Sequence, residues 1–182
     1  ALDHGVGYTP YGDHFMMQCG MEVVLANGDV VRTGMGAMPG NNTWQLFKYG
    51  FGPDVDGIFS QSNFGIVTKM GIWLMPDPGG YRPYMITFER EEDIEQVIEI
   101  LRPLRLNNVI QNAATIRSLV LDAAISSTRS QYYSGAGPIP DSVAKKIMAD
   151  QDIGMWNFCG ALYKPPPIAD ALWTVIRDAF AK

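Results

Sequence analysis

A ten-residue stretch near the start of the chain, GVGYTPYGDH from Gly5 to His14, combines three glycines with two tyrosines. Successive glycines let backbone N–H groups approach an anion or a flat ring, because no Cβ stands in the way. Tyr8 and Tyr11 could stack on such a ring or donate a hydrogen bond to a phenolate. A plain alternative stays open, namely a glycine-rich turn closed by a buried hydrogen bond between Asp13 and His14.

Other familiar catalytic and binding motifs are incomplete or absent in this sequence. GMGAMPG and GFGPDVDG begin like dinucleotide fingerprints, but neither has its third glycine in place or a helix after it. No GxxxxGK[ST] loop and no GxSxG elbow occurs, and DVDG at Asp54 is too short for a calcium loop. His4, Asp13, His14 and Cys19 match no zinc-ligand spacing, so we expect no metal site.

The composition limits the class of protein. A chain of 182 residues with 47% apolar and 18% charged residues is typical of a globular protein. Its net charge of −5 argues against nucleic acid as a partner, and no apolar run approaches the roughly 20 residues of a membrane span. We interpret Cys19 and Cys159 as buried free thiols in a reducing compartment, the cytoplasm. Because the chain opens without methionine, directly in a motif, we expect a piece of a longer polypeptide.

The elements that must position the glycine-rich stretch begin with a β-hairpin over residues 16–33. Its turn, Asn27-Gly28, is a strong hairpin signal, since both positions favour φ > 0. Residues 34–57 indicate an ordered surface loop. The expected aromatic anchors of that loop are Trp44, Phe47, Tyr49 and Phe51. SNFGIVTKMGIWLMP then predicts a buried strand that stops at Pro76.

PDPGG, residues 76–80, is the predicted boundary between units 1–76 and 77–182. After it we expect a strand over 84–88, a helix from about 94 that Pro103 ends or kinks, and a second helix over 114–125. Residues 126–140 suit a plain solvated connection, with a gate over a site as the alternative. Asp141 is the expected N-cap of a third helix, and residues 156–162 a further strand. The inward face of the last helix is expected to hold Ile168, Leu172, Val175, Ile176 and Phe180. This alternation predicts an α+β fold.

Three segments carry a resemblance to a known family. GVGYTPYGDH, FSQSNFGIVTK and WNFCGALYKPPP occur here in the order found in flavoproteins that oxidise para-substituted phenols. The chain is therefore identified, along essentially its whole length, as similar to the vanillyl-alcohol oxidase, eugenol oxidase and 4-cresol dehydrogenase flavoprotein family. The resemblance implies an α+β fold with two parts. Residues 1–76 would be the second part of a 4-cresol-dehydrogenase-type FAD-binding domain, and residues 77–182 the first part of an α+β (ferredoxin-like) cap domain.

The same resemblance assigns the expected site. Residues expected to contact FAD are Asp3, Gly5, Val6, Tyr8, Gly65, Ile66 and Val67. Tyr8 matches the active-site tyrosine that holds the phenolic oxygen, and Val6, Tyr8 and Leu121 would line the substrate pocket. The family's pyrophosphate loop, its flavin-linking residue and its Tyr-Arg pair lie outside these 182 residues. We therefore expect the isolated chain neither to hold FAD tightly nor to turn over substrate.

The reaction that the resemblance implies is hydride transfer from a 4-hydroxybenzyl alcohol or a 4-alkyl or 4-allylphenol to flavin N5, through a quinone methide. The electron acceptor would be O₂ or a cytochrome, and nothing in the sequence separates oxidase from dehydrogenase. A non-catalytic binding or structural module is the alternative from another class. Family members are often dimers or larger, so we expect a homo-oligomer.

Overall fold

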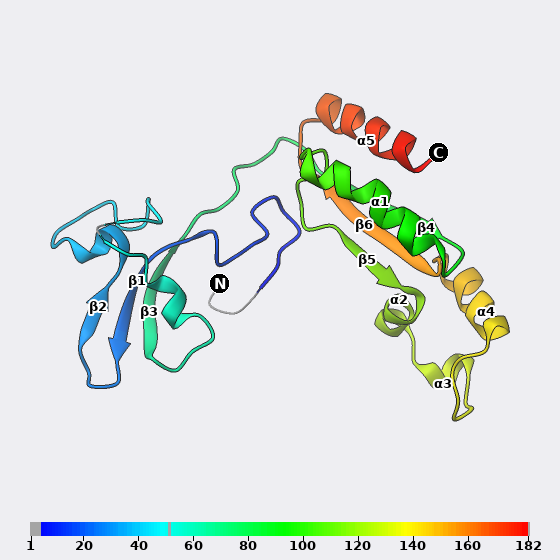
Figure 1. The fold of residues 1–182 in the computed structure, drawn as a ribbon, viewed down its shortest axis with the longest axis horizontal. Coiled ribbons are helices and arrows are strands. Elements are labelled where there is room, and N and C mark those ends of the chain that lie inside the picture. Colours follow the sequence, from blue (N-terminus) through cyan, green and yellow to red (C-terminus); the bar gives the residue numbers. More distant parts are fainter. Residues whose placement is uncertain (1–4, 51, 182) are drawn as a thin grey trace. The chain divides into compact units, whose positions relative to one another are not determined.

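The computed structural model describes residues 5–50 and 52–181 and shows an α+β fold of two compact units, Ala1–Pro76 and Asp77–Lys182 (Figure 1). The division falls within the composition break at PDPGG. The assignment of the units to an FAD-binding and a cap domain stays a prediction. The predicted cofactor contact Asp3, the candidate ligand His4 and the predicted anchor Phe51 lie outside the described residues.

The first unit is built on a three-stranded antiparallel sheet in the order β2-β1-β3. Its strands are β1 (Gln18–Leu25), β2 (Val30–Arg32) and β3 (Gly65–Ile72). Val23 of β1 lies between Val31 and Val67 in the register. Short 3₁₀ helices η1 (Gly34–Ala37) and η2 (Asp56–Phe59) interrupt the long connection from β2 to β3.

The hairpin is confirmed, but its turn differs from the predicted one. Gly28 adopts φ 89°, whereas Asn27 is not among the residues with positive φ. The Leu25 N–H donates to Asp29 O at 2.8 Å and the Gly28 N–H donates to Leu25 O at 2.9 Å. This is a three-residue loop with one left-handed glycine, for which a single φ > 0 position suffices.

The first unit is more open than its sequence predicts. The predicted buried strand β3 has only one buried residue, Gly71, while four of its eight residues are exposed. In the loop 34–57, Trp44 is half-buried, but Phe47 and Tyr49 are exposed and do not act as anchors. A surface with this many exposed large apolar side chains is typical of one that other groups cover.

A buried polar cluster holds the loop to β1 instead. The Lys48 ammonium donates to Phe15 O at 3.3 Å and to Gln18 O at 3.2 Å. The Gln18 amide donates to Asp56 Oδ2 at 2.5 Å, and the Cys19 thiol donates to Gln45 O at 2.8 Å. Burial raises the pKa of the Cys19 thiol, with the nearby charges of Lys48 and Asp56 opposing each other.

The second unit contains a three-stranded antiparallel sheet in the order β4-β6-β5. The strands are β4 (Arg82–Phe88), β5 (Thr115–Ser118) and β6 (Trp156–Leu162), and the helices are α1 (Asp93–Leu106), α2 (Leu119–Ser126), α3 (Arg129–Tyr132), α4 (Asp141–Gln151) and α5 (Pro166–Phe180). Helices α1 and α5 cover one face of the sheet (Figure 1). The main core between them contains Leu104, Ile110, Phe158, Leu162, Ala169 and Ile176.

Four local predictions for the second unit are wrong in whole or in part. Residues 115–118 form β5 before α2 starts, because they pair with β6. Helix α1 does not end at Pro103 but continues to Leu106, since this proline lies in its last turn, and a kink at Pro103 stays a prediction. Pro140 occupies the N-cap of α4, and Asp141 is the first helical residue. Ile168 and Val175 of α5 face solvent, while Ala169 and Ile176 are buried.

Candidate functional site

The glycine-rich stretch folds into a small antiparallel arm. Val6 bridges to Asp13, and the Gly7 N–H donates to Gly12 O at 2.7 Å. Asp13 and His14 are both exposed, and Asp13 Oδ1 accepts a hydrogen bond from the Met16 N–H at 3.0 Å. The alternative of a buried Asp13–His14 hydrogen bond is therefore wrong.

Two glycines of this arm make room for a side chain of the chain itself. A Cβ built on Gly5 would lie 2.9 Å from His14 Nδ1, and a Cβ built on Gly7 would lie 2.7 Å from His14 Nε2. Real Cβ atoms do not approach a ring nitrogen this closely. The group that lies against the glycines in this structure is the His14 imidazole, which the sequence argument did not single out for this role.

The predicted residues between the glycines are available to a ligand. Val6 is 65% exposed and Tyr8 is 62% exposed, next to the half-buried Gly5 and Gly7. The His14 imidazole lies against the glycines of the arm. Val6 presents an exposed aliphatic side chain, and Tyr8, in the bend that follows, presents an exposed phenol hydroxyl that can donate a hydrogen bond.

The second predicted contact region is the start of β3. Gly65 is a packing glycine, because a Cβ there would lie 2.5 Å from Val23 Cγ1. Ile66 is 72% exposed, while Val67 is half-buried and pairs with Val23. Of the three residues, only Ile66 has an exposed side chain, and the backbone contact expected of all three stays a prediction.

Leu121 lies in the second unit, whereas Tyr8 lies in the first. It belongs to α2, which starts after the N-cap Ser118, whose hydroxyl accepts the Leu121 N–H at 3.4 Å. Leu121 is 53% exposed, and its neighbour Asp122 is turned inward and buried. The helix therefore has an exposed apolar side that a substrate or another part of a protein could contact.

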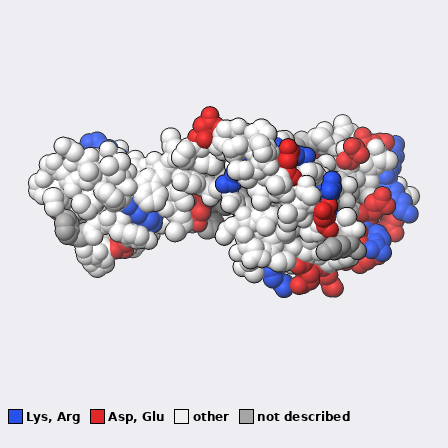
Figure 2. All heavy atoms as spheres, turned by 90° about the horizontal axis from the view of Figure 1, so that it is seen from above, with Lys and Arg blue, Asp and Glu red and all other residues white. Residues whose placement is uncertain are grey.

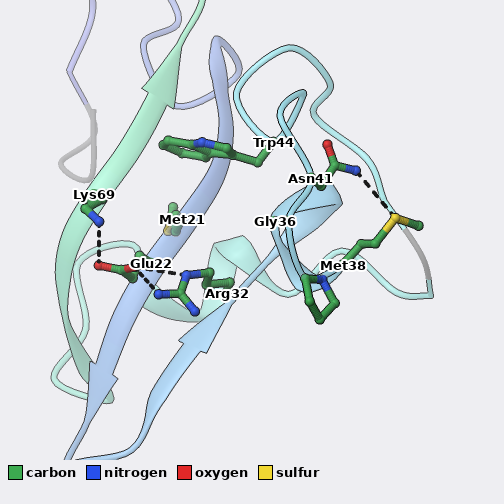
Figure 3. A pocket seen from close by; sticks show the side chains of 10 residues that line it. Met21, Glu22, Arg32, Gly36, Met38, Asn41, Trp44 and Lys69 are labelled. Atoms are coloured by element: carbon green, nitrogen blue, oxygen red, sulfur yellow. Dashed lines mark hydrogen bonds and ion pairs between the residues drawn. The ribbon is translucent and has the colours of Figure 1, made fainter.

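Sequence analysis missed a hollow of about 250 Å³ beside the sheet of the first unit (Figure 3). Glu22 lies at its edge and accepts from Arg32 Nη2 at 2.7 Å and from Thr68 Oγ1 at 3.0 Å, with Lys69 Nζ 3.5 Å away. Hydrogen bonds from Arg32 and Thr68 lower the pKa of the Glu22 carboxyl, and the Lys69 charge adds to the effect. The indole of Trp44 also lines the hollow. The cross-strand pairing of Glu22 with Arg32 was the available signal.

The loop 126–140 forms part of a larger hollow of about 550 Å³ in the second unit. Arg129 fixes this loop by donating to Gly135 O at 2.7 Å and to Gly137 O. The lining is mainly apolar and includes Leu119, Ala123, Tyr132, Ile139, Ile147 and Met155. The loop is thus more than a solvated connection, although its action as a gate stays a prediction.

The structure also bears on a metal site, a membrane-spanning helix and the distribution of charged side chains. Within residues 5–50 and 52–181, no three His, Cys, Asp or Glu side chains gather where they could hold a metal ion. No helix in the same ranges is long and apolar enough to cross a membrane. On the face seen in Figure 2, the basic and acidic side chains of the second unit alternate instead of gathering by sign.

Curated relatives match all or most of the chain. The 4-cresol dehydrogenase [hydroxylating] flavoprotein subunit of Pseudomonas putida is 53% identical over 182 residues, which is all of this chain and 35% of that protein. The 1'-carboxy-chondrochloren decarboxylase of Chondromyces crocatus is 34% identical over 164 residues, 88% of this chain and 30% of that protein. The chain thus spans about a third of the length of these relatives. No family model matches it.

Solved structures also match nearly the whole chain. The structure of p-cresol methylhydroxylase with substrate bound matches 99% of this chain and 35% of its own, with a TM-score of 0.93 and 53% identity. The isoeugenol complex of 4-ethylphenol oxidase from Gulosibacter chungangensis matches 98% of this chain and 34% of its own, with a TM-score of 0.94 and 43% identity.

Proposed function

Because this chain belongs to the flavoprotein family of vanillyl-alcohol oxidase and 4-cresol dehydrogenase, we propose that it is part of an FAD-dependent oxidoreductase of para-substituted phenols. The observation that carries the proposal is identity of 53% over every residue of the chain to a 4-cresol dehydrogenase flavoprotein subunit. The 34% identity to a decarboxylase is weaker. Within the proposal, the first unit contributes to the FAD-binding domain and the second unit to the cap.

The described residues fit part of an FAD site. Val6 and Tyr8 are exposed and offer apolar and aromatic contacts of the kind that a flavin ring system needs, while Gly65, Ile66 and Val67 would meet the ADP half of FAD through their backbone. The Gly7 N–H is not available to a cofactor, because it already donates a hydrogen bond to Gly12 O. The chain therefore supplies part of a cofactor site, and we assign Gly5, Val6 and Tyr8 to its flavin end and Gly65, Ile66 and Val67 to its ADP end.

Tyr8 would act on the substrate oxygen. Its hydroxyl donates a hydrogen bond to the phenolate oxygen, which stabilises the ionised substrate. Electron density from the phenolate then moves toward the benzylic carbon and makes loss of hydride from that carbon easier, leaving a quinone methide that water can attack. A donor fixed before the reaction costs no reorganisation during it. FAD, when bound, supplies the two-electron acceptor for this chemistry.

Substrate contact by the cap is the remaining part of the site. Leu121 would line the phenol pocket from α2, where an exposed apolar side chain matches the apolar ring and alkyl group of the substrate. The substrate class is 4-hydroxybenzyl alcohols and 4-alkyl or 4-allylphenols. The acceptor is O₂ or a cytochrome, the protein acts as a homo-oligomer, and its compartment is the cytoplasm.

The test uses the full-length gene product, purified and examined for flavin absorbance. We expect bound FAD that is bleached by 4-methylphenol without oxygen and recoloured by the acceptor. Release of H₂O₂ in air would indicate the oxidase, and reduction of an added cytochrome without H₂O₂ would indicate the dehydrogenase. A protein that holds no flavin would contradict the proposal and favour the non-catalytic module.

A further inference from the structure

We propose that His14 is a positioning residue, whose imidazole supports the glycine side of the opening arm and thereby fixes the orientation of Tyr8. This inference rests on the proposed function, because it takes the substrate oxygen as the partner of the Tyr8 hydroxyl. It assigns a role to a residue outside the predicted site, and that role is mechanical: His14 touches the arm and not the substrate.

The contact between ring and backbone is close on two residues at once. A Cβ on Gly5 would meet Nδ1 of the ring at 2.9 Å, and a Cβ on Gly7 would meet Nε2 at 2.7 Å and Cε1 at 3.5 Å. The imidazole therefore spans both glycines instead of touching one of them. Neither glycine is among those with positive φ, so the group that takes up the space of a Cβ at both positions is the ring of the exposed His14 side chain, which must move if a side chain is added there.

The backbone bonds described across the arm are too few to fix it by themselves. The Gly7 N–H to Gly12 O bond is short at 2.7 Å, but the His14 N–H to Gly5 O bond is long at 3.4 Å. A bond of that length is weak. The His14 ring, next to the bridge between Val6 and Asp13, adds a further contact at the base of the arm.

Support on the glycine side passes directly to Tyr8. Gly7 directly precedes Tyr8, so the backbone that the imidazole lies against leads into the residue that carries the exposed phenol. If the ring is removed, Gly7 can move into the space that it leaves, and the phenol of Tyr8 moves with it. A displacement of about 1 Å in a group that orients a substrate can reduce the rate about a hundredfold.

The test is a double-mutant cycle in the FAD-loaded full-length gene product. It combines Gly7→Ala and His14→Ala, and it measures kcat and KM for 4-methylphenol, FAD content and Tm for each variant. Gly7→Ala alone should lower kcat/KM about tenfold, because its new Cβ pushes against the ring. In the His14→Ala background the same change should cost less than about twofold, since the ring is gone. His14→Phe, which keeps a flat ring over the glycines, should restore kcat/KM to within about threefold of wild type.

The matched control is Gly57→Ala. Gly57 also lacks positive φ, and a Cβ there would meet no atom within 4 Å. It should leave both kcat/KM and Tm unchanged, which separates the effect of the ring from that of replacing any glycine.

The outcomes distinguish the inference from the proposed function. Additive effects of Gly7→Ala and His14→Ala on kcat/KM would overturn the role of His14, and so would coupling seen in Tm alone. Failure of His14→Phe to restore kcat/KM would overturn it too. In these cases the wild type still oxidises phenols, and the proposed function stands. A wild type that holds FAD but does not oxidise any para-substituted phenol would overturn the proposed function and this role of His14 together.

Discussion

Arg117 joins Asp122 of helix α2 to Cys159 of the central strand β6. Its Nε lies 2.7 Å from Asp122 Oδ1, and its Nη2 donates to Cys159 Sγ at 3.0 Å. Asp122 is buried, whereas Arg117 is half-buried. Burial raises the pKa of the Cys159 thiol, and the charge of Arg117 opposes the shift. The arrangement fixes the first turn of α2 and, with it, the adjacent Leu121.

Removal of Arg117 should destabilise the second unit. Arg117→Leu leaves the Asp122 carboxylate buried without its cation, and we expect a loss of about 2–4 kcal/mol in the free energy of unfolding. The double variant Arg117→Leu/Asp122→Leu should recover most of that loss, because no buried charge remains. Denaturant unfolding of the full-length gene product measures both.

The control for this prediction is Arg102→Leu. Arg102 pairs with Glu99 on the exposed side of α1, so its removal should change the free energy of unfolding by less than about 1 kcal/mol. Equal effects of Arg117→Leu and Arg102→Leu would contradict the importance of burial.

Removal of the Lys48 ammonium should likewise lower the free energy of unfolding of the first unit. Lys48→Met leaves the carbonyls of Phe15 and Gln18 without the ammonium donor, and we expect a loss of about 1–3 kcal/mol. Lys69→Met is the matched change, since Lys69 lies exposed beside Glu22, and it should cost less than about 1 kcal/mol. The same unfolding measurement tests both, and a larger effect from Lys69→Met would refute the prediction.

Tyr84 should make stability depend on alkaline pH. Burial raises its pKa to about 12 from the ordinary value of 10, and its hydroxyl has no partner among the described residues. A raised pKa means that the folded state keeps the proton longer, so stability is complete below pH 10 and falls as the pH rises from 10 to about 12.

Tyr84→Phe tests this dependence. The variant should unfold at a higher pH than the wild type and lose no stability at neutral pH, since it removes a buried hydroxyl without a partner. Tyr81→Phe, at an exposed ring, serves as the control. Identical alkaline unfolding of wild type and Tyr84→Phe would count against the burial argument.

Tyr8→Phe tests the proposed catalytic contact. Loss of one donor to the phenolate should lower kcat/KM for 4-methylphenol by about one to two orders of magnitude, while FAD content stays the same. Tyr49→Phe is the control, because Tyr49 is an equally exposed tyrosine of the same unit. A Tyr8→Phe variant with wild-type kinetics would remove Tyr8 from the site.

Sequence patterns located the hairpin, β4, β6, α1 and α5, because each rests on a local period or on a turn signal. They were wrong over β5, where residues 115–118 have a helix-like pattern but pair with β6. Strand pairing is a long-range interaction that local propensity does not reveal. Lys48 and Asp56 were missed for the same reason, since their partner Gln18 lies on β1, 30 residues from Lys48 and 38 from Asp56 in the sequence.

By itself, the sequence determined the family, the α+β class and the arm in which Tyr8 lies, since these depend on residue order and on local turn chemistry. Only the tertiary structure decided what fills the space beside Gly5 and Gly7. A glycine in the sequence indicates that another group can lie close to the backbone. That group can be a ligand, another strand or a neighbouring side chain. Here it is the imidazole of His14, and that distinction requires coordinates because it depends on which atoms meet in space.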